Sequence, residues 1–320
     1  MQTIYSLQIL RYIAALSIVL FHIPYFRGFT IGVDIFFVLS GFVISYVANI
    51  NKNHFFLKRL IRIIPLYWSL TIFIFIFKLI YPEIFSSHQN VYELFKSLFF
   101  IPIFSEDLSK ILYPVVMVGW TLNYEILFYL LFSFSILISN KYYEYICILL
   151  ISIIVLVPNF IKTENIILIY LSNSIMIEFI YGILIFKLYK NLSYFNHYYY
   201  PIISFLLILI SLQIPFQNIR CIDLGLTSLC IVIFVLSVEK YIPKLEIFNK
   251  IGLLSYAMYL VHSYPISFIG LINTFYNFEQ LTLYVIFIAY IIIISVLSYY
   301  IYAFFEKIII NKTKNKLINV

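Results

Sequence analysis

Long apolar runs separated by short polar segments cover nearly the whole of this chain. An α-helix needs about 20 apolar residues, at a rise of about 1.5 Å each, to cross the hydrocarbon core of a bilayer. A further run, residues 92–104, is apolar but short, which predicts an interfacial or re-entrant helix there. The pattern predicts ten transmembrane helices, near residues 4–23, 31–50, 60–80, 114–138, 145–161, 166–188, 198–214, 219–238, 251–273 and 281–305.

The composition indicates a membrane protein. Hydrophobic residues make up 63% of the 320 residues and charged residues only 11%, a balance that a soluble domain with a single core does not need. The predicted spans use almost the whole length, so we expect a single integral-membrane domain over residues 1–320, without an appended soluble domain and with its first span retained. The expected fold class is an all-α, polytopic transmembrane helical bundle of about ten spans.

The distribution of basic residues predicts the orientation of the chain. Ten spans place both termini on one side of the membrane, and the loops on that side carry most of the Lys and Arg residues. Such loops stay in the cytoplasm, so both termini are expected there and the protein in the cytoplasmic (inner) membrane. His22 and Asp34 then lie near the outer interface, whereas Arg59 and Arg62 lie at the cytoplasmic mouth of the third span.

Two features of the composition disfavour other classes of function. The net charge of +7 is explained by loop orientation, and no nucleic-acid motif accompanies it, so no nucleic-acid partner is expected. Cys147, Cys221 and Cys230 lie in or beside apolar runs without CxxC or His-rich spacing. This pattern predicts packing roles for the cysteines and no metal site.

The first span carries two ionisable residues, Arg11 and His22, eleven positions apart. Eleven residues make about three helical turns, so both side chains project from nearly the same face. Charge at membrane depth is costly and favours a functional role. An imidazole that titrates near neutral pH can act as a general base, and an arginine deeper in the membrane can bind an anion. The alternative is an interfacial histidine and a snorkelling arginine.

Arg59 and Arg62 lie three residues apart near the start of the third span. Residues at this spacing share one face of a helix. Two guanidinium groups there can bind phosphate oxygens bidentately. The alternative is a basic cytoplasmic flank that only orients the helix.

Asp34 opens the second span. It can favour the helix N-terminus through capping or the helix dipole. Its other expected role is to hold His22 in one tautomer across the short loop. Both interpretations stay open from the sequence.

Glu125 carries a carboxylate into the fourth span, in the segment that begins with Trp120. Burying a carboxylate without a partner is expensive, so we predict a functional role for Glu125. The structural alternative is an ion pair with Arg11 or Arg220.

The ninth span places polar groups near the middle of the membrane, in the segment Ser255-Tyr256-Ala-Met-Tyr259-Leu-Val-His262. Together with Trp120, Tyr259 and His262 are expected to bind substrate. Polar packing between helices is the alternative.

In their order along the chain, these segments resemble the acyltransferase-3 family of integral-membrane O-acyltransferases, from Leu7 to about Lys307. The chain departs from the family pattern at Gln8-Ile9, Thr121 and Ile308. The resemblance rests on Arg11-x10-His22, Gly32-Val-Asp34-x-Phe36-Phe37-Val-Leu-Ser40-Gly41-Phe42, Arg59-x-x-Arg62 with Pro65-x-Tyr67-Trp68, Trp120 to Glu125 with Phe128-Tyr129, and Ser255-Tyr256-x-x-Tyr259-Leu-x-His262.

The resemblance implies specific roles. In the family the first-span histidine is regarded as essential to acyl transfer, which implies that role for His22. The third-span arginine pair is associated with the acyl donor, which implies donor binding by Arg59 and Arg62.

We therefore expect an enzyme that moves an acyl group, acetyl being the expected one, from acyl-CoA to a sugar hydroxyl of a surface polysaccharide or a lipid-linked glycan precursor. The arginine pair and Arg11 would bind the donor. His22 would deprotonate the acceptor hydroxyl or pass the acyl group on, oriented by Glu125 or Asp34. The expected partners are acetyl-CoA, the glycan acceptor and the lipid bilayer; the oligomeric state is left open.

Two alternatives come from other classes. A transporter or flippase for an anionic lipid-linked sugar would use the intramembrane charges as a substrate path. The chain shows no internal repeat, which disfavours the repeat-built transporter folds. A regulatory membrane subunit would be favoured if His22 proved dispensable.

Overall fold

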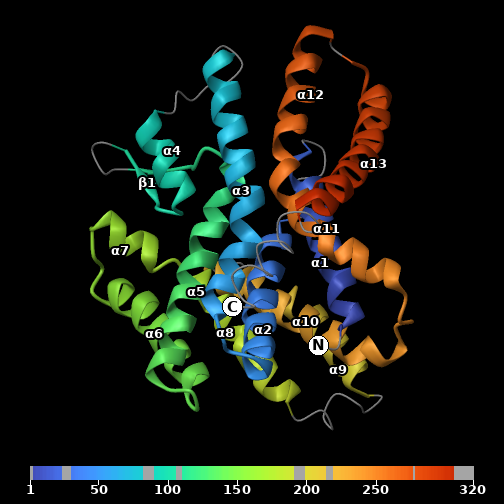
Figure 1. The fold of residues 1–320 in the computed structure, drawn as a ribbon. Coiled ribbons are helices and arrows are strands. Elements are labelled where there is room, and N and C mark those ends of the chain that lie inside the picture. The colour runs from blue at the N-terminus through green and yellow to red at the C-terminus, as the bar shows by residue number, and fades with distance from the viewer. Residues whose placement is uncertain are drawn as a thin grey trace. The chain divides into compact units, whose positions relative to one another are not determined.

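Helices make up nearly all the regular structure in the computed structural model, which describes residues 3–23, 30–81, 90–105, 110–190, 199–213, 219–276 and 278–305 (Figure 1). The all-α prediction is confirmed for these residues. The chain divides into two compact units, each assembled from three stretches of sequence. The first unit comprises Met1–Ala14, Ile31–Phe56 and Tyr124–Gly252, and the second comprises Ala15–Thr30, Leu57–Asn123 and Leu253–Val320.

Because these stretches alternate, some helices contribute residues to both units. These are α1 (Tyr5–His22), α3 (Phe55–Ile80), α5 (Trp120–Ile138) and α11 (Glu246–Val261). The first unit also contains α2 (Gly32–Ile50), α6 (Tyr143–Phe160), α7 (Ile166–Leu171), α8 (Met176–Tyr189), α9 (Tyr199–Ser211), the π-helix η4 (Cys221–Gly225), α10 (Leu226–Val238) and the 3-10 helix η5 (Glu239–Tyr241).

Helices α2 and α8 of the first unit pack closely through two glycines. A Cβ atom added at Gly41 would collide with the carbonyl oxygen of Phe179, and one added at Gly182 would collide with that of Val38. Small residues let two backbones approach in this way within a membrane. The apolar core around this contact consists of Leu7, Leu10, Ala14, Ile35, Val38, Leu39, Phe42, Ile185, Phe186, Val232 and Leu236.

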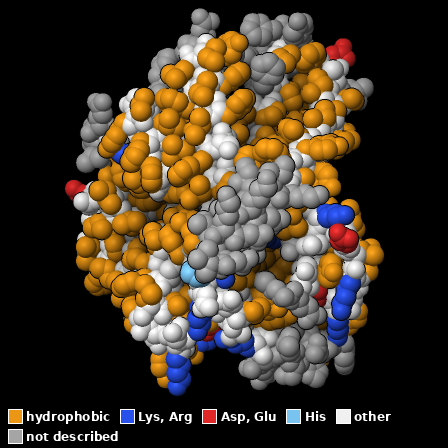
Figure 2. Space-filling view, viewed as in Figure 1, with side chains coloured by type: hydrophobic (Ala, Val, Ile, Leu, Met, Phe, Trp, Pro, Cys, Tyr) orange, Lys and Arg blue, Asp and Glu red, His pale blue; other side chains and the backbone are white. Residues whose placement is uncertain are grey.

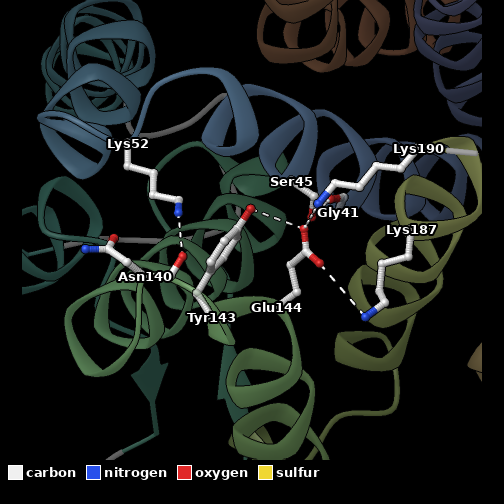
Figure 3. A network of polar contacts seen from close by, with 8 residues as sticks. All are labelled: Gly41, Ser45, Lys52, Asn140, Tyr143, Glu144, Lys187 and Lys190. Carbon is white, nitrogen blue, oxygen red and sulfur yellow. Dashed lines mark hydrogen bonds and ion pairs between the residues drawn. The ribbon is translucent and has the colours of Figure 1, made fainter.

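A polar network joins α6 to α8 in the first unit (Figure 3). Glu144, in the first turn of α6, is buried and accepts a hydrogen bond of 3.1 Å from Lys190, while Lys187 lies 4.0 Å away. The hydroxyl of Tyr143 donates to the same carboxylate at 3.2 Å. Lys52, from the loop after α2, lies 4.4 Å from the centre of the Tyr143 ring. One buried carboxylate thus ties together the ends of two helices.

The second unit adds a short helix and a hairpin between α3 and α5. This segment contains α4 (Val91–Leu98), the antiparallel strands β1 (Ile103–Phe104) and β2 (Ile111–Leu112), and the 3-10 helix η2 (Met117–Gly119). Asn90 and Glu93 form a capping box at the start of α4. The Trp68 indole N–H donates to the carbonyl of Leu98 at 2.8 Å, which fixes α4 on α3. The helices α12 (Ser263–Tyr276) and α13 (Gln280–Phe304) complete the unit.

Eight helical segments in the described chain are long and apolar enough to cross a membrane. They match eight of the ten predicted spans, and the other two spans stay predictions. The segment predicted as residues 198–214 gives the 13-residue helix α9. The segment predicted as residues 251–273 is divided between α11 and α12. The eight are Tyr5–His22, Gly32–Ile50, Phe55–Ile80, Met117–Ile138, Tyr143–Phe160, Ile166–Tyr189, Cys221–Tyr241 and Thr282–Phe304.

The division between α11 and α12 has a local cause. Pro265 has no amide hydrogen, so it cannot donate to the carbonyl of Val261, and its ring clashes with a continuing helix. The helix therefore ends at Val261, and His262 occupies the turn. Hydrophobic side chains cover much of the face seen in Figure 2, as expected of a protein surrounded by lipid.

Candidate active site

Two histidines from distant parts of the sequence meet in the second unit. His22 ends α1, and His262 lies in the turn between α11 and α12. The Nε2 atom of His262 lies 3.2 Å from Nδ1 of His22. Their ring centroids are 4.8 Å apart, with the ring planes at 65°. His22 is half-buried whereas His262 is 0% exposed, so only His22 offers an accessible surface to a substrate.

Each imidazole also faces a backbone carbonyl close to it in sequence. Nδ1 of His22 lies 2.8 Å from the carbonyl oxygen of Ile18. Nδ1 of His262 lies 2.7 Å from the carbonyl oxygen of Tyr259. The hydroxyl of Tyr290, on α13, donates to the carbonyl of His262 at 2.6 Å. The buried imidazole is therefore fixed by contacts from α11 and α13.

Tyr259 and Trp120 belong to the same unit as the histidine pair. The Tyr259 hydroxyl donates to the carbonyl of Val118 at 2.8 Å and lies 2.7 Å from the hydroxyl of Thr121. Trp120, at the start of α5, is half-buried. These contacts hold α11 against the start of α5. Substrate binding by Trp120 and Tyr259 stays a prediction.

The arginine pair lies within α3 itself. The helix begins at Phe55, before residue 60, where the third span was predicted to start. Arg59 is buried and Arg62 is half-buried, on neighbouring positions of one helical face. The Tyr256 hydroxyl donates to the carbonyl of Ile63 at 3.0 Å, which places α11 against this part of α3. The burial of Arg59 favours a role beyond a basic flank, and phosphate binding stays a prediction.

Asp34 has a partner in the first unit. Its fully buried carboxylate accepts two hydrogen bonds from Arg220, at 2.8 Å from Nε and 2.9 Å from Nη2. Glu178 of α8, also fully buried, neighbours this ion pair. The ion pair joins α2 to the residue that precedes η4. The catalytic role expected for Asp34 stays a prediction.

Glu125 also lies in the first unit, on α5. Its carboxylate accepts a hydrogen bond of 3.3 Å from the hydroxyl of Ser40 and another from the hydroxyl of Tyr129. Arg220, considered as its partner from the sequence, binds Asp34. Arg11 is half-buried in the part of α1 that belongs to the first unit. Functional roles for Glu125 and Arg11 stay predictions.

Sequence reasoning missed several partners of the predicted residues. It did not pair the two histidines, and it gave Ser40 and Tyr129 no role. Tyr129 lies one helical turn after Glu125, so the spacing of four residues was an available signal. No local pattern indicates the contact of Ser40, which comes from another helix.

A family model and two relatives all relate this chain to acyltransferases or to polysaccharide production. The model of a family described as an acyltransferase domain, acyltransferase-3, matches residues 4–301. The exopolysaccharide production protein ExoZ of Rhizobium meliloti is 28% identical over 268 residues, which cover 78% of this chain and 82% of that protein. "Putative acetyltransferase ORF330" of Acidianus two-tailed virus is 26% identical over 288 residues, 82% of this chain and 84% of its own length. No solved structure matches the chain.

The buried ion pair predicts a loss of stability when only its cation is removed. Arg220→Met should lower the free energy of unfolding by about 3 kcal/mol, because the buried carboxylate of Asp34 would lose its charge partner. This is the lower end of the usual range, since 34% of the Arg220 side chain is exposed. Thermal unfolding in detergent measures the effect.

The double variant Arg220→Met, Asp34→Asn should recover much of this loss, since it leaves no unpaired charge. Lys244→Met, at an exposed loop lysine, is the matched control. A stability of Arg220→Met equal to that of the unaltered protein would contradict a structural role for the pair.

Proposed function

Because this chain belongs to the acyltransferase-3 family and is a multi-pass membrane acyltransferase, we propose that it moves an acyl group from acyl-CoA to a sugar hydroxyl. The acceptor we propose is a surface polysaccharide or its lipid-linked precursor, and the acyl group is acetyl. The names of two relatives support these choices, one for exopolysaccharide production and one as an acetyltransferase.

The observation that carries this proposal is the environment of His22. Its Nδ1 is held by a carbonyl and by a buried imidazole. Within the described part of the chain its Nε2 has no hydrogen-bond partner. A half-exposed imidazole with one nitrogen fixed and the other available is suited to take a proton from a substrate.

The proposed reaction balances without a further reactant. His22 takes the proton of the acceptor hydroxyl while that oxygen attacks the carbonyl carbon of the thioester. The carbon–sulfur bond then breaks, and the CoA thiolate takes the proton back from the His22 imidazolium. The products are the sugar ester and CoA with a free thiol. In a second version the imidazole first accepts the acyl group and then passes it to the hydroxyl.

Arg59 and Arg62 are proposed to bind the phosphates of acetyl-CoA. They share one helical face and lie in the same unit as His22. Guanidinium groups bind phosphate oxygens through charge-assisted, bidentate hydrogen bonds. Arg11 is proposed to contribute a further positive charge to donor binding.

The remaining predicted residues are assigned to the acceptor and to the electrostatics of the site. Trp120 and Tyr259 are proposed to contact the acceptor sugar. Catalytic roles for Glu125 and Asp34 are proposed from the sequence pattern alone, and both residues belong to the first unit.

The membrane arrangement proposed is a single domain in the cytoplasmic (inner) membrane with both termini in the cytoplasm. The Lys and Arg residues of the loops support this orientation. The donor would then enter from the cytoplasm and the acceptor from the opposite side. The acyl group would cross much of a hydrocarbon core about 30 Å thick.

Replacing His22 tests the proposed base. His22→Ala should lower glycan acylation by about 10²- to 10⁴-fold, the usual contribution of a general acid–base residue. Mass spectrometry of the host glycans measures acylation, and the amount of protein in membranes checks insertion. His54→Ala, at an exposed loop histidine, is the matched control. Near-normal acylation in His22→Ala would place the base elsewhere.

Replacing the arginine pair tests donor binding. Arg59→Ala and Arg62→Ala should each raise the KM for acetyl-CoA about tenfold or more, since a hydrogen bond to a charged group contributes about 1.5–3 kcal/mol. The KM for the acceptor should change less. Lys244→Ala, at an exposed loop lysine away from α3, is the control. An unchanged donor KM would leave the pair with an orienting role only.

Thiol labelling tests the orientation. Cysteines introduced at Asn53 and Glu164, both exposed in loops, should react with an impermeant reagent from opposite faces of oriented vesicles. The native Cys147, Cys221 and Cys230 are buried and provide the background measurement. Labelling of both positions from one face would refute the proposed crossing of the acyl group.

A further inference from the structure

We propose that His262 is a positioning residue that holds His22 in the tautomer with an unprotonated Nε2. The inference rests on the proposed function, because it explains how His22 becomes a general base. It replaces the expectation that His262 binds substrate. His262 is 0% exposed, so its ring acts through His22 rather than on a substrate.

Two backbone carbonyls decide which ring nitrogens carry hydrogen. A carbonyl oxygen can only accept a hydrogen bond. Nδ1 of His22 lies 2.8 Å from the oxygen of Ile18, so this nitrogen carries a hydrogen. Nδ1 of His262 lies 2.7 Å from the oxygen of Tyr259, so it carries one as well.

The contact between the rings then has a fixed direction. Neutral His262, protonated on Nδ1, has a lone pair on Nε2. This atom lies 3.2 Å from Nδ1 of His22, so His262 accepts the hydrogen bond. His22 shares one N–H between this acceptor and the oxygen of Ile18. Neutral His22 therefore carries its own lone pair on Nε2, the nitrogen available for a substrate.

The opposite direction is disfavoured at both carbonyls. If neutral His262 donated from Nε2, its Nδ1 lone pair would face the oxygen of Tyr259 at 2.7 Å. Nδ1 of His22 would need a lone pair facing the oxygen of Ile18 at 2.8 Å. Each close pair would then consist of two acceptors without a hydrogen between them, which repel and leave buried groups unsatisfied.

The chain fixes His262 where this role requires it. The turn before Pro265 places the residue between two helices, and the Tyr290 hydroxyl donates to its carbonyl at 2.6 Å. When His22 gains a proton during the reaction, its Nδ1–H becomes a stronger donor. The lone pair of His262 then supports the imidazolium without adding a charge of its own.

Two substitutions of His262 separate positioning from packing. In His262→Gln the amide oxygen can replace Nε2 as the acceptor, whereas His262→Leu offers no acceptor. We expect kcat for acetyl transfer to fall about 10- to 100-fold in His262→Leu, the loss seen when the hydrogen-bond partner of a metal-bound histidine is removed. The KM values for donor and acceptor should stay unchanged, and His262→Gln should keep most of the activity.

Three outcomes would overturn the proposal. Equal losses in both variants would reduce His262 to a packing role. An unchanged kcat in His262→Leu would remove its part in the reaction. A raised acceptor KM at unchanged kcat would show substrate contact instead.

A spectroscopic measurement decides the tautomer independently of activity. In the ¹⁵N NMR spectrum of the full chain labelled at histidine, the His22 signals are those lost in His22→Ala. At a pH where the ring is neutral, a protonated Nδ1 with an unprotonated Nε2 supports the proposal, and the reverse tautomer overturns it. The measurement needs no variant of His262, so it holds even where His262→Leu does not fold. Absence of acetyl transfer by the unaltered protein would instead refute the proposed function.

Discussion

Inside a bilayer there is no water to satisfy a polar group, so a partner within the protein stabilises a buried charge or ring nitrogen. The carboxylate of Asp34 pairs with Arg220, and that of Glu144 pairs with two lysines. The imidazole of His22 contacts a backbone carbonyl and a second imidazole. Each solution joins segments that are far apart in the sequence. In a chain whose helices are apolar on most faces, these contacts specify which helices become neighbours within a unit, a choice that apolar packing alone leaves less defined.

The same constraint governs the interrupted helix at His262. A proline in an apolar run removes one backbone hydrogen bond, and hydrocarbon offers no substitute. Irregular backbone at membrane depth is tolerated where the protein itself covers it, and His262 is fully buried. The carbonyl of His262, the residue at the break, accepts a hydrogen bond from the Tyr290 hydroxyl of α13. The interruption therefore also gives the buried imidazole a rigid support, which a side chain in a uniform helix would obtain only through packing.

The sequence predicts what depends on local properties and not what depends on partners. Apolar length is local, and eight predicted spans are confirmed by length and composition. The interruption within residues 251–273 was not predicted, because hydropathy stays high through Pro265 and does not show where a helix is divided. Charged residues in spans could be singled out by their cost. The partners of these residues could not be predicted from the sequence. Asp34 and Arg220 are 186 positions apart, His22 and His262 are 240 apart, and no periodic pattern connects either pair.

A neutral partner for His22 is consistent with the same energetics. The fully buried carboxylate of Asp34 is paired with a cation, Arg220. A carboxylate bound to His22 would stabilise the imidazolium strongly and would hold the proton that the leaving thiolate must regain. Neutral His262 orients the ring without adding a buried charge. In the proposed reaction His22 is then uncharged before and after each transfer and charged only during it. A neutral partner stabilises the His22 imidazolium less than a carboxylate would. His22 therefore needs no buried counter-ion and releases its proton readily to the thiolate.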